Sequence, residues 1–398
     1  MKILYAVHQY LPQNRAGTEV YTHTLAKNLT SQAEVLVFCG RGCVSPSEND
    51  GAILSYEGVS VRQLAAGDER SLGPLCEFRH DYLNPNAARV FSSVLDDYQP
   101  DIVHIQHLKG LGAGLVSEAK SRDIPVVMTL HDYWAICPNA QFVRPDGAIC
   151  YSTHWNYECA QCAAAKLDRP SVRYLAPFMV PLFGHRRGVL QRTLRTINAF
   201  VAPSLFLRNK YAAAGYPVEK IHILENGLDV SRIAGRHAND QPYRGHYAYV
   251  GSLAWQKGVH VLVDAFRQLG DCGVTLRIWG NPTMFPEYAQ ELKLIAKDCP
   301  WIEFMGEIAS ERVGKVYEWA DYALLGSLWW ENSPVTIQEA YAAGVPVIAP
   351  RLGAMEEKVH DGETGLLYAA GDAADLIRTI RIAHEDKALL SRLRPNLQ

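Results

Sequence analysis

Long hydrophobic runs and an excess of one charge are both missing from this chain of 398 residues. No apolar stretch reaches the roughly 18 residues that a membrane-spanning helix needs, and the apolar part of the N-terminus is too short for a secretory signal peptide. Lys plus Arg total 39 and Asp plus Glu 42, so the net charge is −3 and no nucleic-acid partner is predicted. We therefore expect a cytoplasmic protein whose nine cysteines are mostly reduced.

Internal repeats and low-complexity segments are also missing, and the composition is that of an ordinary globular protein, with 48% hydrophobic and 20% charged residues. Short apolar runs alternate with helical patterns along the whole chain, which indicates an α/β protein with parallel sheets buried on both faces. Strands are predicted at 3–7, 35–39, 59–64, 102–106, 126–130, 200–203, 221–225, 247–251, 275–280, 302–306, 322–326 and 345–349. Helices are predicted at 19–31, 87–98, 259–269, 287–298 and 335–343.

The number of predicted strands is too large for one compact open sheet, so the chain is expected to form two domains. We place the first domain at 1–200 and the second at 201–398, each a doubly wound, Rossmann-like unit. Two such units facing across a cleft would bind ligands at the carboxyl ends of their strands. Residues 137–198 interrupt the alternation and are predicted to be a long irregular insertion, and such insertions are more often functional than not.

The first candidate site lies at residues 330–340, where a strand, a loop and a helix follow one another. Ser333 is predicted to cap the helix and Pro334 to occupy its first position. Glu331 then lies in the loop and Glu339 in the second helical turn. The helix N-terminus would attract a diphosphate, and carboxylates beside such an anion site are suited to binding the hydroxyls of a sugar and a ribose.

Three further strand ends carry polar or glycine residues. Lys257 follows a strand and could neutralise a departing diphosphate, and no Asp-x-Asp motif at a strand end indicates a metal-dependent alternative. Gly17 opens a helix after the first strand, where a glycine lets a phosphate or sugar approach the backbone. His131 and Asp132 end a fifth strand. Each of these residues also has a purely structural alternative. His131 could be a core histidine, Lys257 a surface lysine and Gly17 an ordinary turn glycine.

With these motifs together, the chain resembles the retaining glycosyltransferases of family 4, which have the GT-B fold. The resemblance rests on Glu331 and Glu339 separated by seven residues, followed by Ala-Gly-Val-Pro-Val-Ile at 343–348. It is strengthened by the Asn-Gly-x-Asp turn at 226–229 and by the glycine and acidic motifs at 353–367. The His-Asp-Tyr-Trp-x-x-Cys-Pro motif at 131–138 is similar to a bacterial cell-surface polysaccharide branch.

The resemblance implies that the domain at 1–200 binds the acceptor and the domain at 201–398 binds the nucleotide-sugar donor. It also implies a role for each matching residue. Glu331 would hold the donor-sugar hydroxyls, with the backbone N–H groups of Asn332 and Ser333 beside it, and Glu339 would bind the ribose. The remaining roles are a diphosphate contact for Lys257, a contact near the reacting carbon for His131, and a phosphate loop shaped by Gly17. Ser252 stands where the family commonly has an arginine. Family members close with a helix that returns to the first domain, and because this chain stops at Gln398 we expect part of that segment to be missing.

The implied reaction transfers a sugar from a nucleotide-diphosphate sugar to a hydroxyl of a glycan or lipid-linked oligosaccharide acceptor, with retention of configuration. The acceptor would enter from the face on which the diphosphate leaves, so catalysis depends on charge stabilisation and positioning and needs no cofactor. Two other enzymes on the same fold remain possible, a nucleotide-sugar epimerase and a phosphorylase with a pyridoxal cofactor. A non-catalytic scaffold that binds sugar nucleotides is the third alternative.

Two features of the insertion at 137–198 are not explained by this reaction. The insertion contains four cysteines, Cys137, Cys150, Cys159 and Cys162. Their number and their Cys-x-x-Cys element suit a structural zinc or, less favourably, an iron–sulfur cluster, and unpaired reduced thiols are the alternative. The stretch from Lys166 to Arg195 interleaves basic and apolar side chains. It is predicted to contact anionic lipid headgroups at the inner face of the membrane, unless it only caps the first domain.

Overall fold

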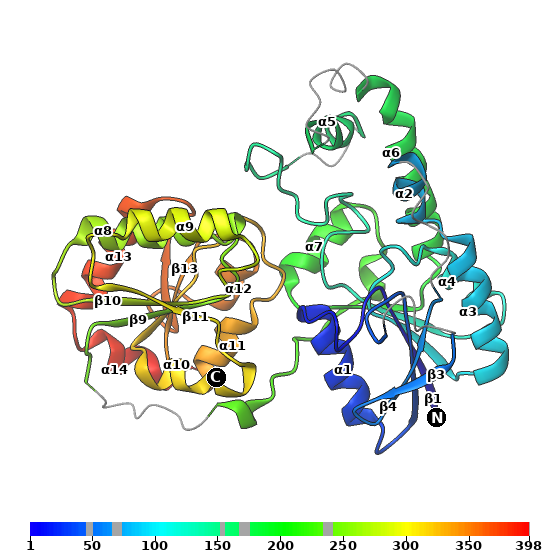
Figure 1. The fold of residues 1–398 in the computed structure, drawn as a ribbon, viewed down its shortest axis with the longest axis horizontal. Coiled ribbons are helices and arrows are strands. Elements are labelled where there is room, and N and C mark those ends of the chain that lie inside the picture. Colours follow the sequence, from blue (N-terminus) through cyan, green and yellow to red (C-terminus); the bar gives the residue numbers. More distant parts are fainter. Residues whose placement is uncertain (45–50, 66–73, 152–155, 167–175, 234–241, 398) are drawn as a thin grey trace. The chain divides into compact units, whose positions relative to one another are not determined.

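The computed structural model describes residues 1–397 apart from 45–50, 66–73, 152–155, 167–175 and 234–241. The chain divides into two compact units, Met1–Leu224 and Glu225–Gln398 (Figure 1). The first unit extends beyond the predicted boundary near residue 200 because two further strands join its sheet. Each unit contains one mainly parallel sheet covered by helices, as the apolar character of the strands predicted.

The first unit is built on an eight-stranded sheet of order β3-β4-β2-β1-β5-β6-β7-β8. Every neighbouring pair is parallel except β3 and β4, which form an antiparallel edge that the sequence analysis missed. The strands are β1 (Lys2–Val7), β2 (Glu34–Cys39), β3 (Ile53–Tyr56), β4 (Val59–Gln63), β5 (Ile102–Ile105), β6 (Val126–Thr129), β7 (Ala199–Ala202) and β8 (Ile221–Ile223).

Helices on the two faces of this sheet exclude water from it. On one face, α1 (Gly17–Leu29) packs against the side chains of β1, β2 and β4. On the other, the ring of Phe91 in α3 (Pro85–Tyr98) lies 5.2 Å from the ring of Phe38 in β2. The unit also contains α2 (Pro74–His80), α4 (Gly114–Lys120) and α7 (Leu205–Ala213).

The segment predicted to be an irregular insertion is in large part helical. A loop with one isolated antiparallel bridge, Val143 to Ile149, leads to α5 (Asn156–Lys166), and α6 (Ala176–Leu194) follows. The sequence analysis allowed for a basic helix that caps the first domain but gave no bounds for α6, because Pro181 lies inside the helix and its apolar residues do not keep one clear stripe. Figure 1 shows α2, α5 and α6 together at one end of the first unit.

The second unit has a fully parallel six-stranded sheet of order β11-β10-β9-β12-β13-β14. The strands are β9 (His246–Val250), β10 (Thr275–Trp279), β11 (Ile302–Gly306), β12 (Tyr322–Leu324), β13 (Val347–Pro350) and β14 (Gly365–Tyr368), the last of which was not predicted. The helices are α8 (Val259–Leu269), α9 (Pro286–Ile295), α10 (Gly314–Trp319), α11 (Val335–Ala342), α12 (Ala354–Lys358), α13 (Ala373–Glu385) and α14 (Leu389–Leu393).

Two apolar clusters hold this sheet between its helices. Residues of α8, α9, α13 and α14 form one cluster with the sheet, and residues of α10, α11 and α12 form the other. Figure 1 shows α8 and α9 on the opposite side of the sheet from α10 and α11. Among the described residues, none of the helices combines the length and the apolar character that crossing a bilayer requires.

The strand orders identify one topological switch point in each unit. In the first unit, successive strands are added on one side of β1 and then, from β5 on, on its other side. In the second unit, the same change of side occurs between β9 and β12. In open α/β sheets, ligands bind beyond the carboxyl ends of the strands at such points. Ligand-binding and catalytic residues are therefore expected in the loops that follow β1, β5, β9 and β12.

Candidate functional site

Two glycines bring the loops after β9 and β12 together in the second unit. Gly258 has φ +62°, and a Cβ atom at this position would collide with the carbonyl oxygen of Gly326. The Leu328 N–H also donates to the carbonyl of Gln256 at 2.9 Å. Only residues without a side chain allow this approach, and it fixes the position of Lys257 relative to the loop that carries Glu331.

Three donors converge on one oxygen of the Glu331 carboxylate. Its Oε1 atom accepts from Lys257 Nζ at 2.6 Å, from Ser327 Oγ at 2.7 Å and from Trp329 Nε1 at 2.9 Å. The whole residue is only 7% exposed, so water does not screen these interactions strongly. The Lys257 ammonium also lies 5.6 Å from the centre of the Trp329 ring. The sequence analysis singled out both charged residues but did not predict that they pair with each other.

The helix after this loop begins where its predicted range does, but its cap differs from the prediction. α11 starts at Val335 with Pro334 as its N-cap, and the Ser333 side chain makes no capping hydrogen bond. Proline fixes a backbone φ that suits the entry to the helix, so the serine is not required for it. Among the described residues, the buried Ser333 Oγ has no hydrogen-bond partner. A buried hydroxyl of this kind is costly unless a ligand group satisfies it.

Glu339 lies in the second turn of α11, as predicted, and is 9% exposed. Its Oε1 atom is 3.5 Å from Arg232 Nη2, and its Oε2 atom accepts from the Tyr317 hydroxyl at 3.2 Å. Burial raises the pKa of this carboxyl above its usual value of 4.5, although Arg232 and Tyr317 oppose the shift. The Asp229 carboxylate accepts from the Ser231 N–H at 3.0 Å and so shapes the turn that presents Arg232.

In the first unit, polar side chains gather beyond the ends of β1, β5 and β6. His131 Nε2 lies 2.8 Å from Gln106 Oε1, which can only accept, so His131 donates through this nitrogen. Burial, with a smaller effect of His107, lowers the pKa of His131 to about 3, which keeps the ring neutral. The amide nitrogen of Gln106 is buried and has no hydrogen-bond partner among the described residues.

His107 and Asp132 form a dyad beside His131. His107 Nδ1 accepts from the Lys109 N–H at 3.1 Å, so its proton resides on Nε2, which donates to Asp132 Oδ2 at 3.1 Å. Burial works against ionisation of Asp132, but His107, the Trp134 N–H and His131 together hold the pKa of Asp132 below its usual value. The pairing fixes the orientation of the His107 ring and of the Asp132 carboxylate, and a carboxylate held in this way can accept a proton.

Gly17 begins α1, and a Cβ atom added to it would meet nothing within 4 Å. The protein's own packing therefore does not require glycine at this position. Two residues later, Glu19 is 1% exposed, accepts from the Ala16 N–H at 3.0 Å and lies 3.5 Å from His8 Nε2. Burial raises the pKa of Glu19. The sequence analysis did not recognise His8 or His107 as site residues, although each follows closely after a strand end, and it assigned no role to Glu19.

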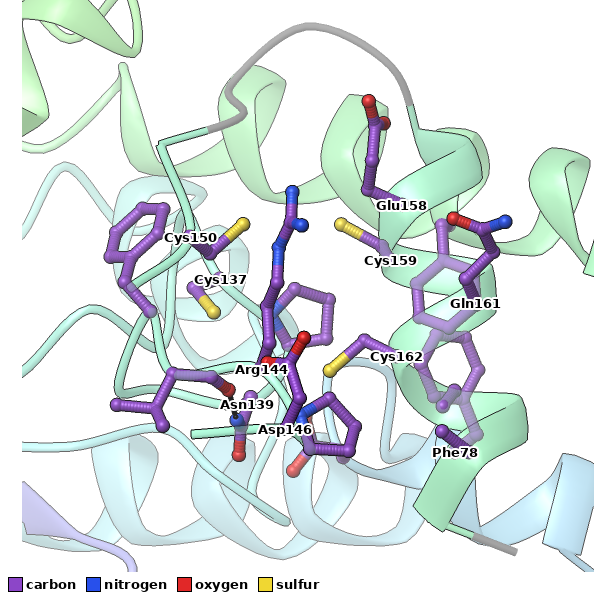
Figure 2. A pocket seen from close by; sticks show the side chains of 18 residues that line it. Phe78, Cys137, Asn139, Arg144, Asp146, Cys150, Glu158, Cys159, Gln161 and Cys162 are labelled. Carbon is purple, nitrogen blue, oxygen red and sulfur yellow. Dashed lines mark hydrogen bonds between the residues drawn. The ribbon is translucent and has the colours of Figure 1, made fainter. Parts of the chain in front are cut away.

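The four cysteines of the predicted metal site line one cavity of about 780 Å³ in the first unit. Figure 2 shows Cys137 and Cys150 on the loop side and Cys159 and Cys162 on α5. As their side chains stand, no three His, Cys, Asp or Glu residues within the described part of the chain are close enough to hold one ion. None of the nine cysteines forms a disulfide in the structure.

The predicted lipid-binding stretch from Lys166 to Arg195 does not present all of its residues to solvent. Arg186 is 2% exposed and donates to the Trp134 carbonyl at 2.6 Å, and Phe183 is 4% exposed. Both pack inside the first unit, so the prediction that they face a membrane is corrected. Phe178 is 79% exposed and Arg192 is also exposed. Residues 167–175, which include Arg169 and Arg173, lie outside the described residues.

The sequence matches two families of known proteins. Residues 15–232, more than half of the chain, match the family described as Glycosyltransferase Family 4. Residues 244–386 match the family described as Glycosyl transferases group 1. The chain belongs to the family 4 glycosyltransferases.

Curated relatives agree with this family. A 42.6 kDa protein of the cps region of Klebsiella pneumoniae is 23% identical over 372 residues, which cover 90% of this chain and 87% of the relative. The amylovoran biosynthesis glycosyltransferase AmsK of Erwinia amylovora is 30% identical over 58% of this chain and 60% of its own length. Glycogen synthase of Mycobacterium tuberculosis is 29% identical, but the match covers only 45% of this chain and 43% of that enzyme.

Solved structures show the same fold at low sequence identity. HepE of Anabaena in complex with UDP has a TM-score of 0.69 at 19% identity, covering 100% of this chain and 94% of HepE. Sucrose-phosphate synthase of Thermosynechococcus elongatus has a TM-score of 0.67 at 17% identity, covering 100% of this chain and 93% of that one. The fold is therefore GT-B, as the resemblance implied.

Proposed function

We propose that this protein is a retaining glycosyltransferase that moves a sugar from a nucleotide-diphosphate sugar to a hydroxyl of a glycan or lipid-linked glycan. The observation that carries the proposal is the switch point of the second unit, where buried Glu331 and Glu339 flank the start of α11. Structures of a GT-B neighbour bound to UDP and to UDP-glucose support a nucleotide-sugar donor. AmsK supports a role in polysaccharide synthesis.

The donor would be held by groups with complementary chemistry. Glu339 would accept hydrogen bonds from the two ribose hydroxyls. The backbone N–H groups of Asn332 and Ser333 and the Lys257 ammonium would neutralise the diphosphate, and Glu331 would accept from the sugar hydroxyls. Lys257 lies 2.6 Å from Glu331, so one cation can serve both the sugar-binding carboxylate and the leaving group. Preorganised positive charge at a leaving group is a main source of rate acceleration.

In the first unit, we assign His131 to the donor sugar, Gly17 to the phosphate loop and the neighbouring polar groups to the acceptor. The neutral state of His131 supports a hydrogen-bonding role for it rather than a charged one. Asp132 and His107 offer a place for the acceptor proton, in addition to the leaving phosphate itself. Contact with an anionic membrane would use the exposed Phe178 and Arg192 of α6 and Arg195, which follows the helix.

The test incubates the protein with a glycan acceptor and each of a panel of nucleotide sugars. Nucleotide release is measured first, and the anomeric configuration of the product is then determined. We expect release from at least one donor, acceptor-dependent product with the donor's configuration, and activity in the presence of a chelator of Mg²⁺ and Mn²⁺. An inverted product or a strict requirement for either ion contradicts the mechanism. Epimerised nucleotide sugar without transfer supports the epimerase instead, and binding without turnover supports the scaffold.

A further inference from the structure

We propose that Cys137, Cys150, Cys159 and Cys162 bind one zinc ion and form a structural four-thiolate site in the first unit. This inference concerns the segment between β6 and β7 and does not depend on the transferase activity. It starts from the shared cavity into which the loop and α5 direct these side chains (Figure 2).

The backbone brings the four residues together from two short segments. In the loop, the Cys150 N–H donates to the Phe142 carbonyl at 2.7 Å and the Val143–Ile149 bridge closes a small hairpin, so Cys150 returns toward Cys137. In α5, Cys159 and Cys162 are three residues apart, which places them on one face of the helix. Each segment thus supplies two ligands, the arrangement common in structural zinc sites.

The cavity also contains polar groups besides the four sulfurs. The backbone N–H groups of Asn139, Gln141 and Phe142 lie near the Cys137 sulfur, and such groups commonly surround metal-bound sulfur. One oxygen of the nearby Glu158 carboxylate is buried and, among the described residues, makes no hydrogen bond. The four sulfurs and this oxygen are groups that can attract a cation.

The surrounding charges suit the ion as well. A zinc ion with four thiolates has a net charge of −2, and such a buried charge needs cations nearby. Arg144 lines the cavity, and the buried Arg186 interacts electrostatically with Cys137 and Cys159. Arg186 is only partly compensated by Asp81, whose carboxylate is 3.7 Å away. Asp81, Asp146 and Glu158 also line the cavity and balance part of this positive charge.

Among the described residues, the apolar cluster around α5 is small. It consists of Ala160, Ala176 and Phe183 with a few partly buried neighbours. Small units with so little core commonly depend on a metal or a disulfide for stability. Because the thiols stand too far apart for coordination as described, binding requires them to rotate toward the ion. Figure 2 shows the Arg144 side chain between Cys150 and Cys159, so this side chain must move aside.

A chain of contacts connects this cavity to the polar groups at the sheet edge. Arg186 donates to the Trp134 carbonyl at 2.6 Å, and the Trp134 N–H donates to Asp132 Oδ1 at 2.7 Å. Trp134 Nε1 also donates to Asp81 at 2.8 Å. A metal ion that restrains this loop would therefore also restrain, through Trp134, the position of Asp132.

The first test is elemental analysis of the full chain purified with a reductant and without added metal. We expect about one zinc per chain in the wild type. Cys159→Ser and Cys162→Ser should lose it. The matched controls Cys76→Ser and Cys272→Ser change exposed thiols outside the cavity and should keep it.

The second test uses only the wild type, so it does not rely on variants that fail to fold. Removing zinc with a chelator should expose four more thiols to a thiol reagent and lower the thermal transition, and replacing zinc by Co²⁺ should produce intense thiolate-to-cobalt absorption. Re-adding zinc should reverse each change. Protein that is metal-free and equally stable with and without a chelator overturns the proposal. Iron in place of zinc, or two disulfides between these cysteines in the unreduced protein, also overturns it.

Discussion

The Lys257 ammonium lies 2.6 Å from Oε1 of Glu331, and the two residues come from loops after different strands of the second unit. The side chain of Lys257 is 28% exposed and that of Glu331 is 9% exposed, so the pair is largely protected from solvent. In the proposed reaction, these residues contact the leaving diphosphate and the sugar that becomes positively charged. Changing either one should therefore alter the action of the other.

The first prediction follows from this pair. Lys257→Met and Glu331→Gln should each lower kcat/KM, and the double variant should lose less than the product of the two effects. Contacting residues couple by about 0.5–3 kcal/mol, which is measurable from steady-state kinetics of the four proteins. Lys315→Met with Glu318→Gln is the matched control, because this exposed pair on α10 has the same chemistry away from the switch point. Independent effects at Lys257 and Glu331 would show that the pair does not act as a unit.

Glu339→Ala should weaken binding of the free nucleotide by about 1.5–3 kcal/mol, roughly 10- to 150-fold, because the ribose hydroxyls lose a charged acceptor. Glu331→Ala should leave nucleotide affinity nearly unchanged and lower kcat, since its contact is to the sugar. Calorimetry and kinetics separate the two effects. Glu385→Ala, an exposed glutamate on α13, is the control. Normal nucleotide affinity in Glu339→Ala would mean that the two roles are assigned wrongly.

Nucleotide affinity should also depend on pH through Glu339. Burial raises the pKa of this carboxyl above 4.5, and the proposed contact requires the ionised form. Affinity should therefore fall as the pH decreases through the raised pKa, at a higher pH than an ordinary glutamate would produce. The measurement is the nucleotide Kd across the mildly acidic range. In Glu339→Gln this part of the pH dependence should disappear, and its persistence would point to another group.

Two glycines should respond differently to substitution by alanine. Gly258→Ala should destabilise the second unit by about 1–3 kcal/mol, because the new Cβ meets the Gly326 carbonyl at a positive φ. Gly17→Ala meets no protein atom within 4 Å, so it should keep the thermal transition and lose activity only if a ligand approaches this backbone. Thermal unfolding and donor turnover distinguish the two cases. Full activity of a stable Gly17→Ala protein would make Gly17 an ordinary helix-start residue.

The proposed membrane contact should depend on the exposed part of α6. Sedimentation with vesicles should show binding that needs anionic lipid and weakens with salt. Phe178→Ser with Arg192→Ser should reduce it and leave activity on a short soluble acceptor unchanged. Changes at Arg186 are unsuitable because this residue is buried. A wild-type protein that ignores anionic vesicles at low salt would show that the stretch is a structural cap.

The local sequence by itself determined the α/β class, most of the strands and the two glutamates of the second unit. Short runs of β-branched and apolar residues that alternate with helical patterns indicate buried parallel strands. The spacing of Glu331 and Glu339 is an unusual sequence motif. The edge strand β3, with half of its residues exposed, lacks such a run and was missed. The bounds of the helix α6 were not predicted for a similar reason, since Pro181 lies inside it and its apolar stripe is weak.

Only the tertiary structure decided which residues act together. Lys257 and Glu331 are separated by 74 positions, and the contact between Gly258 and Gly326 that aligns them depends on the crossing of two loops. His107 and Asp132 pair because β5 and β6 are neighbours in the sheet, which no local pattern encodes. Arg186 resembles a membrane-facing residue in the sequence but is buried against Trp134 in the fold. Local sequence fixes the chemistry and periodicity of each segment, whereas long-range packing fixes which side chains meet.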